Sequence, residues 1–544
     1  MRLSHLFIVL FAVILLTSCA SFVMTYVSLA VPIGPWIDPT LALFVLMWLQ
    51  MYSWLSWPTF DLERWLLIVL SAAGIGGIVG TAAAWSFPTL YFLNADQAQH
   101  WLYLPMICIV GMGSMILVAG GFGLVIARLF GTKLVENRSM TFPVAQLVVQ
   151  TVEVKDDVVK GASLVAGMVT SGIFHTAQEW GSLIPRIWHV TREMWIGMWR
   201  IPALNISLVV APMVWAIGFT TGHVIAVPFA VGILLKSMIF EPCYRIWFTT
   251  CLSEQSFMLA CCTGLVIFGA LQGFWQLLNK LVRARLDGLR DRWQAALQWS
   301  SQLLQIDVVL VLAATFIIMY LGKFSCAGWL YLVLTTAVSC FQLMLLMGRT
   351  GLAPFPRFAT FVMVPGLVLF GYSPFQCMLV TAFVEIAGGV AAIAASGYKI
   401  NILRDLRAER PIYGVQWMAL VISAICVATL LYTLAAGIGL GSELLTAQRC
   451  QARALLIQAH DMNLWVIVLG MCGGLLLQLL NINGTLVLGG LLMPLDWSLL
   501  LIGGGLLASC TRRREDYYPL WSGIFMVSSL WIGVRAVMQV MVCR

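Results

Sequence analysis

The chain has 544 residues, of which 61% are hydrophobic and only 10% are charged, and its mean hydropathy is +0.94. A soluble domain carries about 25% charged residues, so this composition excludes a soluble globular protein and predicts an all-α polytopic membrane protein. The net charge of +8 is interpreted as the Lys and Arg excess of cytoplasmic loops. We expect no nucleic-acid partner.

The N-terminal residues allow two interpretations. Arg2, an apolar stretch and the sequence LTSCA around Cys19 are typical of a bacterial lipoprotein signal that is cut before the cysteine. The same residues can open a membrane-spanning helix that is never removed. The apolar run continues without a charge to Pro32, which is long enough to span with some tilt. We therefore expect one helix over 6–31, with Cys19 as an unprocessed packing residue.

Segments of roughly 20 mostly apolar residues can span a bilayer as helices. About sixteen such segments follow one another with short connections, and they suggest two halves, 1–299 and 300–544. The expected spans are 6–31, 40–57, 65–93, 103–130, 159–180, 201–221, 222–241, 255–279, 305–322, 326–348, 357–372, 374–396, 414–440, 463–482, 484–510 and 519–541.

Basic loops predict the orientation of these spans. Lys and Arg cluster in 128–160, 280–292, 349–357 and 399–410, and an even number of spans separates each cluster from the next. The positive-inside rule places these loops and the N-terminus in the cytoplasm, in a protein of the cytoplasmic (inner) membrane. The stretch 186–200 is basic on the predicted outer side, and its tryptophans suggest an interfacial helix.

Three segments contain polar or helix-breaking residues. Pro494 and Asp496 lie in the centre of 484–510, where a broken or re-entrant helix and a simple kink are both open interpretations. The stretch 137–157 is too polar to cross lipid. Phe142 and Pro143 begin a short amphipathic helix there, which by itself is typical of a cytoplasmic surface helix. Gly and Pro residues also interrupt 211–242, and such interruptions expose backbone groups that can bind a ligand.

Glu385 is the clearest acidic residue within a predicted span. An intramembrane carboxylate is costly, so Glu385 is a candidate proton carrier, and a structural hydrogen bond to a neighbouring helix is the alternative. His175 and Glu179, one helical turn apart, form a weaker candidate. The 14 cysteines and six histidines show no metal-ligating spacing. The sequence contains no nucleotide-binding loop and no Ser/His/Asp arrangement, so we expect no metal site, no cofactor and no enzymatic activity.

At these residues the chain resembles the oligopeptide transporter (OPT) family, nearly from end to end. The family's Phe-Pro start after the fourth helix is similar to MTFPVAQLV, and its next landmark is similar to APMVWAIGFTTG followed by VPFAVGILLKSMIFEP. The stretch AASGYKIN (394–401) is similar to a family segment ending in Gly-Tyr, without the acid and the Asp-Leu-Lys that precede it there. The ending LGGLLMPLDWSLLLIGGGLLASCTRRRED is similar to the family's last Gly-rich helix and basic loop.

The resemblance implies a secondary active transporter of about sixteen helices in two related halves, with broken or re-entrant segments. It implies proton-coupled import of small peptides or peptide-like compounds, with a metal-chelate importer of the same family as the alternative. An integral membrane enzyme acting on lipid-linked substrates is a weaker alternative. Partners would be the substrate, protons and membrane lipid, and the chain could form a homo-oligomer.

Glu385 is the expected proton-coupling group, and the other candidates would contact substrate near the midplane. The candidate substrate-binding residues are Phe142, Pro143, Gln146, Pro212, Gly218, Gly222, Tyr398, Lys399, Asn481 and Asn483.

Overall fold

A computed structural model describes most of the chain. It covers residues 3–30, 62–136, 140, 142–153, 158–179, 187–192, 195–196, 199–200, 204–209, 212–248, positions within 257–268, 306–351, 353–404, 409–437, 439–440, 445, 447–458, 464–480, 487, 490–491, 495–512, 514–525, 527–528 and 530–531.

Long apolar helices dominate the described part of the chain. Six of them have the length and composition to cross a membrane: Ile68–Leu93, Pro105–Val135, Ala226–Trp247, Cys326–Arg349, Pro374–Leu403 and Pro411–Gly437. Five shorter apolar helices accompany them: Leu10–Tyr26, Asp307–Leu321, Phe355–Phe370, Trp465–Leu479 and Ser498–Cys510. The chain is therefore a multi-pass, mainly helical membrane protein. The expected number of about sixteen spans stays a prediction, because segments such as 40–57 and most of 255–279 lie outside the described residues.

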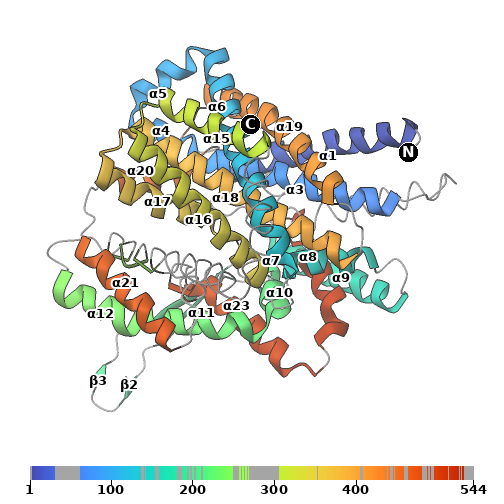
Figure 1. Ribbon diagram of the computed structural model, residues 1–544. Helices are drawn as coiled ribbons and strands as arrows, with labels where there is room; N and C mark the ends of the chain where they lie inside the picture. Colours follow the sequence, from blue (N-terminus) through green and yellow to red (C-terminus); the bar gives the residue numbers. More distant parts are fainter. Residues whose placement is uncertain are drawn as a thin grey trace, which may run out of the picture.

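One large bundle surrounds α18 (Pro374–Leu403), whose candidate span is completely buried (Figure 1). The helices around it are α3 (Leu62–Ser86), α6 (Pro105–Ile126), α16 (Cys326–Thr350), α17 (Phe355–Phe370) and α19 (Glu409–Gly437), and α1 (Leu3–Ala30) packs on the outside against α3 and α19. Small residues along α18 permit close approach, which drives helix association in lipid. A Cβ atom at Gly123 of α6 would lie 2.3 Å from the carbonyl oxygen of Ala387.

A second group of helices lies beside this bundle (Figure 1). It contains α10 (Pro212–Thr221), α11 (His223–Leu235), α21 (Leu464–Leu479) and α23 (Leu495–Cys510). Both α10 and α11 pack against α23, so the two Gly/Pro-interrupted segments of the sequence lie against each other. At 16 residues, α23 extends about 24 Å. It begins at Leu495, directly after Pro494, which lies outside the described residues.

The remaining elements complete the architecture. They are α4 (Thr89–Leu93), α5 (Ala95–Leu102), η1 (Ala127–Gly131), α7 (Thr132–Val135), α8 (Pro143–Glu153), α9 (Val158–Glu179), η3 (Lys236–Phe240), α12 (Glu241–Cys243), η4 (Tyr244–Phe248), α15 (Ile306–Leu321), α20 (Gln448–Gln458) and η5 (Arg514–Tyr517).

A β-hairpin occupies the stretch expected to be an interfacial helix. β1 (Ile187–Arg192) pairs antiparallel with β4 (Leu204–Val209), and β2 (Trp195–Ile196) pairs with β3 (Trp199–Arg200). The helical expectations for 186–200 and for the first part of 201–221 are therefore wrong, since the helix begins at Pro212. β-branched and aromatic residues are frequent in this stretch and favour paired strands.

The expectation of a cytoplasmic surface helix after residue 142 is also wrong. Val144, Ala145, Val148 and Val149 of α8 are buried, because the helix packs against α18, α10 and α16. The helix is amphipathic as expected, but its apolar side faces protein. A short helix is stable within the bundle when neighbouring helices cover it.

α1 is one helix from Leu3 to Ala30 and runs through Cys19 without interruption. Thr17 and Ser21 are buried against α3, where a Cβ at Gly76 would lie 2.7 Å from the carbonyl oxygen of Thr17. Cys19 is exposed. Residues on both sides of Cys19, such as Val13 and Thr25, are buried in the fold.

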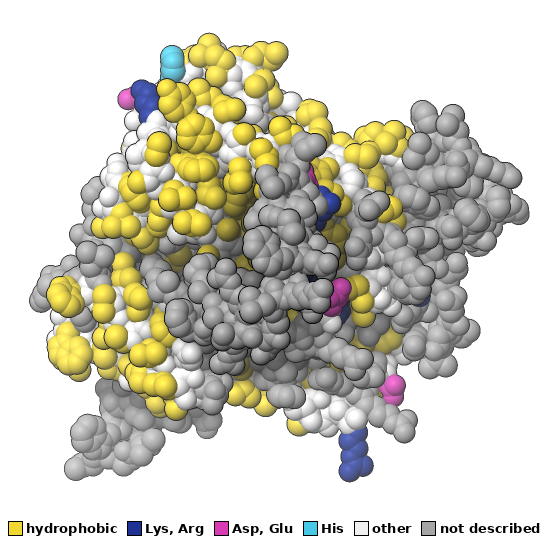
Figure 2. Space-filling model, viewed as in Figure 1, with side chains coloured by type: hydrophobic (Ala, Val, Ile, Leu, Met, Phe, Trp, Pro, Cys, Tyr) yellow, Lys and Arg dark blue, Asp and Glu magenta, His cyan; other side chains and the backbone are white. Residues whose placement is uncertain are grey.

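Hydrophobic side chains cover most of the described surface in Figure 2, and charged groups are isolated on it. Large apolar residues are exposed on several outer helices, including Leu310 and Ile317 of α15 and Ile425 of α19. Contiguous exposed apolar surface of this kind marks contact with lipid or another protein. The surface thus agrees with the composition in indicating a membrane protein.

Candidate functional site: a buried arginine–glutamate centre

Glu385 is fully buried in the middle of α18, with 0% of its surface exposed. The helix is well formed here because Ser373 and Gln376 make a reciprocal capping box at its start. Gly388 and Gly389, one turn later, permit the close approach of Leu343 and Ile78, and Phe355 at the start of α17 lies in van der Waals contact with both positions. The carboxylate therefore lies where the N-terminus of α17 meets the middle of α18.

Arg453 of α20 is the partner of Glu385. Its Nη2 donates to the Glu385 carboxylate, and the side chain is itself only 5% exposed. Nη1 donates to the carbonyl oxygen of Trp85 at 2.8 Å, and Nη2 also reaches the carbonyl oxygen of Pro356 at 3.3 Å. One guanidinium thus joins α20 to α18, to the end of α3 and to the first turn of α17.

A broken helix supplies two of the acceptors around α20. α3 ends at Ser86 and α4 begins at Thr89, with Pro88 in the intervening turn. Proline has no N–H, so it leaves the carbonyl four residues earlier, that of Ala84, without its helical donor. The Cys450 thiol donates to this oxygen at 3.5 Å and to that of Trp85 at 3.1 Å.

An aromatic layer carries a second arginine beside the pair. The Arg449 guanidinium lies 3.9 Å from the Trp85 ring centroid, and Trp85 stacks on Phe355 at 5.5 Å. The charge of Arg449 is attracted to Glu385 and repelled by that of Arg357 in α17. Among the described residues, Arg453 and Arg449 thus lie beside this one acid, and Arg357 lies next to Arg449, so the arginines of the centre outnumber its acid.

The second carboxylate oxygen of Glu385 has an available lone pair. Within the described part of the chain, Oε2 is buried and makes no hydrogen bond, whereas Oε1 accepts from Arg453. An unsatisfied buried oxygen is costly in an apolar interior. This atom can accept a proton or a donor group from a ligand without losing an existing contact.

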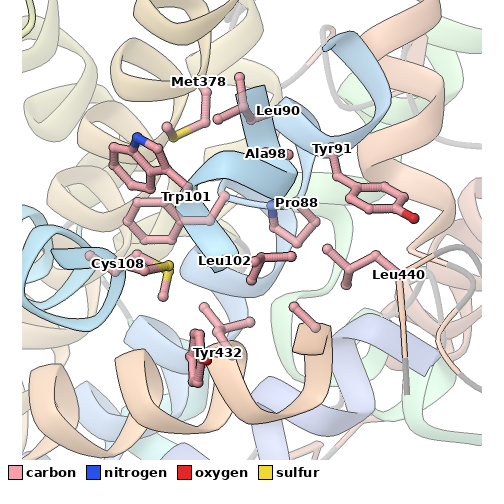
Figure 3. Close-up of a pocket in the computed structure, with 14 residues that line it drawn as sticks. Pro88, Leu90, Tyr91, Ala98, Trp101, Leu102, Cys108, Met378, Tyr432 and Leu440 are labelled. Carbon is pink, nitrogen blue, oxygen red and sulfur yellow. The ribbon is translucent and has the colours of Figure 1, made fainter. Parts of the chain in front are cut away.

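A small apolar pocket lies between the α3–α4 turn, α5, α18 and α19 (Figure 3). Its volume is about 60 Å³, and its lining includes Phe87 and Pro88 of the α3–α4 turn, Trp101 of α5, Tyr432 of α19 and Met378 of α18. Met378 precedes Glu385 by seven residues, or about 10 Å along the helix. The pocket is therefore about two helical turns from the carboxylate.

Phe142 lies in an unusual backbone conformation at the start of α8. Its φ is 48°, its side chain is 1% exposed, and its N–H donates to the carbonyl oxygen of Gly348 at 2.7 Å. A bulky residue in this left-handed region is an outlier that surrounding structure must maintain. Pro143 follows as the first residue of α8, and the Gln146 N–H donates to the Phe142 carbonyl oxygen.

Tyr398 and Lys399 lie near α8 and apart from Glu385. Lys399 Nζ donates to the carbonyl oxygen of Val135 at 3.1 Å, and Tyr398 is buried. Val144 of α8 and Ser396 of α18 line a common small cavity. Because 14 residues of helix extend about 20 Å, Glu385 and Lys399 belong to two separate locations rather than to one shared site.

Pro212, Gly218 and Gly222 lie in the other helix group. A Cβ at Gly218 would lie 2.4 Å from the carbonyl oxygen of Leu501, so this glycine permits the close contact of α10 with α23. Gly222 has a φ of 64° and separates α10 from α11. Gly218 and Gly222 permit close helix packing, and Pro212 is the first residue of α10. Asn481 and Asn483 lie outside the described residues.

His175 forms a smaller polar cluster at the end of α9. Its Nε2 lies 3.1 Å from Ser528 Oγ, which lies 3.0 Å from Ser171 Oγ, and its ring stacks on Trp531. Glu179 is close enough to interact electrostatically with the imidazole. Across the described ranges, no three His, Cys, Asp or Glu residues come together in a way that could hold a metal ion.

Comparison with known proteins adds no assignment: no family model matches the chain, and no curated protein matches it either.

Arg453 is the residue that sequence reasoning missed. It lies in the polar segment QRCQARALLIQ between two predicted spans, which by itself is typical of a loop. An arginine beside a short apolar run would have been a candidate counter-charge for Glu385, because intramembrane carboxylates pair with cations. Sequence alone does not identify which of the 31 Lys and Arg residues fills that role.

Proposed function

We propose that the protein is a secondary active transporter that imports small peptides or peptide-like compounds and couples their movement to protons. Glu385 is the proton-coupling group. The observation that carries the proposal is the fully buried Glu385–Arg453 pair, with Oε2 available and broken helices around it. Such buried ionisable groups at interruptions of membrane helices are typical of transport pathways.

The charge of the centre supports an anionic group on the substrate. Arg357, Arg449 and Arg453 outnumber the one acid near them in the described residues. Arginine binds carboxylates through paired, charge-assisted hydrogen bonds. A peptide-like compound would place its carboxylate among these guanidiniums, while Trp85 and Phe355 offer an apolar surface to its side chains.

Proton coupling follows from competition at one carboxylate. With Glu385 ionised, Arg453 is satisfied internally. When Glu385 binds a proton, the guanidinium becomes available to a substrate carboxylate, so the proton and the anionic substrate bind together. Resemblance to the OPT family supports this assignment, and with it a location in the cytoplasmic membrane with the N-terminus in the cytoplasm.

A metal-chelate importer is the second candidate. Chelators derived from amino acids carry several carboxylates, and a centre with surplus arginine would bind the whole complex rather than its metal. Uptake of chelates but not of free peptides would favour this alternative.

Uptake into proteoliposomes tests the proposal. Di- to tetrapeptides, glutathione and metal chelates are screened with and without an inward proton gradient. We expect the gradient to drive accumulation in the wild type, and Glu385→Gln to abolish the gradient dependence. Thr381→Val, one turn away on the same buried helix, is the matched control and should keep it. Full gradient-driven accumulation by Glu385→Gln would overturn the role of Glu385.

A further inference from the structure

The Glu385 carboxylate is closed off from solvent on every side in this structure. Arg453 of α20 binds the carboxylate, and the same guanidinium binds the carbonyl oxygens of Trp85 in α3 and Pro356 in α17. A proton or a ligand therefore reaches Oε2 only after one of the surrounding elements moves. The question is which element the contacts allow to move.

α20 differs from its neighbours in length and composition. Its 11 residues extend about 16 Å, well short of the roughly 30 Å of a bilayer core. It carries Gln448, Arg449, Gln451 and Arg453, and it is absent from the candidate membrane spans. Displacing α20 exposes less apolar surface than displacing a spanning helix such as α3.

Polar contacts fix α20 in place. Arg453 binds Glu385, the Cys450 thiol donates to the Trp85 carbonyl oxygen, and Arg449 stacks on the Trp85 ring. The helix starts after Ala447, whose φ of 43° is unusual for a residue other than glycine. The Ala447 N–H donates to the carbonyl oxygen of Leu29 at 2.9 Å, which anchors this end of α20 to α1.

We propose that α20 is a gate over the Glu385 centre, that Arg453 is its latch, and that a proton on Glu385 releases it. This inference deepens the proposed function, on which it rests, by naming the mobile element and the residue that couples it to the proton. Arg453 fixes α20 while Glu385 is ionised, and its guanidinium becomes available to a substrate carboxylate once Glu385 binds a proton.

The charges around Glu385 give the direction of the switch. Arg453, Arg449 and Cys450 face it from α20, and Arg357 of α17 faces Arg449; α3 presents the Trp85 carbonyl oxygen to the same guanidinium. With Glu385 ionised, its charge holds α20. Protonation of Glu385 leaves Arg453 buried without its counter-charge, which is strongly unfavourable. The latch is therefore closed at high pH and opens as pH falls.

The apolar pocket lies where an opened gate would admit a ligand. Leu440, on the segment that leads to α20, lines the pocket together with Phe87 and Pro88 (Figure 3). α20 packs against α4, which forms another part of the same wall. Movement of α20 would widen the pocket toward Glu385.

Cys450 is a native reporter for this movement. It is a residue of α20 and is fully buried, with its thiol against the backbone of α3, so N-ethylmaleimide reaches it only when the gate opens. The full-length protein is labelled at one fixed pH, and modification of each cysteine is measured by peptide mass spectrometry. We expect Glu385→Gln to accelerate labelling of Cys450 by about tenfold or more over the wild type, since local opening controls access. Cys340, buried in α16, should stay unlabelled.

Controls separate the gate from unfolding. Thr381→Val should leave Cys450 as protected as in the wild type. If Glu385→Gln also exposes Cys340, the variant has unfolded and cannot test the gate. Arg453→Gln then serves as the test variant, and we expect it to expose Cys450 in the same way. Arg453→Lys should fall between Arg453→Gln and the wild type. A further readout is the ratio of Cys450 labelling to labelling of Cys326, which is exposed. In the wild type this ratio should rise as pH falls. In Glu385→Gln it should be independent of pH.

Equal protection of Cys450 in the wild type, Glu385→Gln and Arg453→Gln would overturn the gate, whatever the uptake assay shows. Exposure of Cys450 together with a failure to find proton-driven uptake would leave the gate standing and reject the proposed transport. The two proposals thus fail independently.

Discussion

The backbone N–H of Phe142 donates to the carbonyl oxygen of Gly348 at 2.7 Å, and the Phe142 ring lies over the same glycine. This contact joins the start of α8 to the end of α16. The connection from α16 then leads to Pro356, whose carbonyl oxygen accepts from Arg453. One short stretch of backbone therefore links the strained Phe142 turn to the Glu385 centre.

Gly348→Ala should disturb this link. The added Cβ would lie 2.9 Å from Cε2 of the buried Phe142 ring, and such overpacking costs about 1–3 kcal/mol. We expect a lower thermal midpoint in detergent and reduced uptake. Gly414→Ala, in open space within α19, is the control and should be neutral or stabilising by up to about 1 kcal/mol. Equal stability of the two variants would contradict the contact.

Removing either partner of the buried pair should be costly. Arg453→Met leaves Glu385 as an uncompensated buried charge, a loss of about 3–5 kcal/mol in comparable pairs. The double variant Glu385→Leu/Arg453→Met should recover much of that stability and still fail to transport. A double-mutant cycle by thermal unfolding measures the coupling; additive effects would show that the two side chains do not interact.

The contact between α10 and α23 should depend on Gly218. A Cβ there would lie 2.4 Å from the carbonyl oxygen of Leu501, which is backbone and cannot rotate away. We expect Gly218→Ala to destabilise the protein by about 1–3 kcal/mol. Gly172→Ala, at a helical position with nothing within 4 Å, provides the comparison. Unfolding midpoints that shift equally would argue against close packing of these helices.

Cys19 should remain unmodified in the mature protein. α1 uses residues on both sides of Cys19, including Val13 and Ser21, for buried contacts, so cleavage before Cys19 would remove packing that α3 requires. Mass spectrometry of the purified protein should find the N-terminal segment intact. A mature chain that starts at a lipidated Cys19 would reject this expectation.

The ion pair of Arg128 with Asp307 should contribute less to the free energy of unfolding than the buried pair of Glu385 with Arg453. Its N–O distance is 2.7 Å, and Tyr413 also donates to Asp307, but the arginine side chain is 41% exposed. Solvent screening reduces such pairs to about 0–1 kcal/mol. Asp307→Asn should therefore change the unfolding midpoint by less than Arg453→Met does, as measured under the same conditions.

Composition was sufficient to identify a helical membrane protein, because the free energy of transferring apolar side chains into lipid is set residue by residue. The same local reasoning identified Glu385 as a buried carboxylate of special interest and the interruptions at Phe142 and Gly222. Both Phe142 and Gly222 adopt positive φ angles. The helix break at Pro88, by contrast, was not predicted, because the apolar segment 65–93 has the composition of one continuous span.

Tertiary structure alone decided the partners of these residues. Arg453 meets Glu385 across 68 residues of chain, and α8 is buried although its sequence resembles that of a surface helix. Residues Ile187–Arg192 and Leu204–Val209 pair as strands, although the basic and aromatic residues of this part of the sequence resemble an interfacial helix. In each case the outcome depends on which other segment of the chain packs against the residues or pairs with them. Hydropathy does not encode that choice, because it describes each residue's preference for lipid and not its partner.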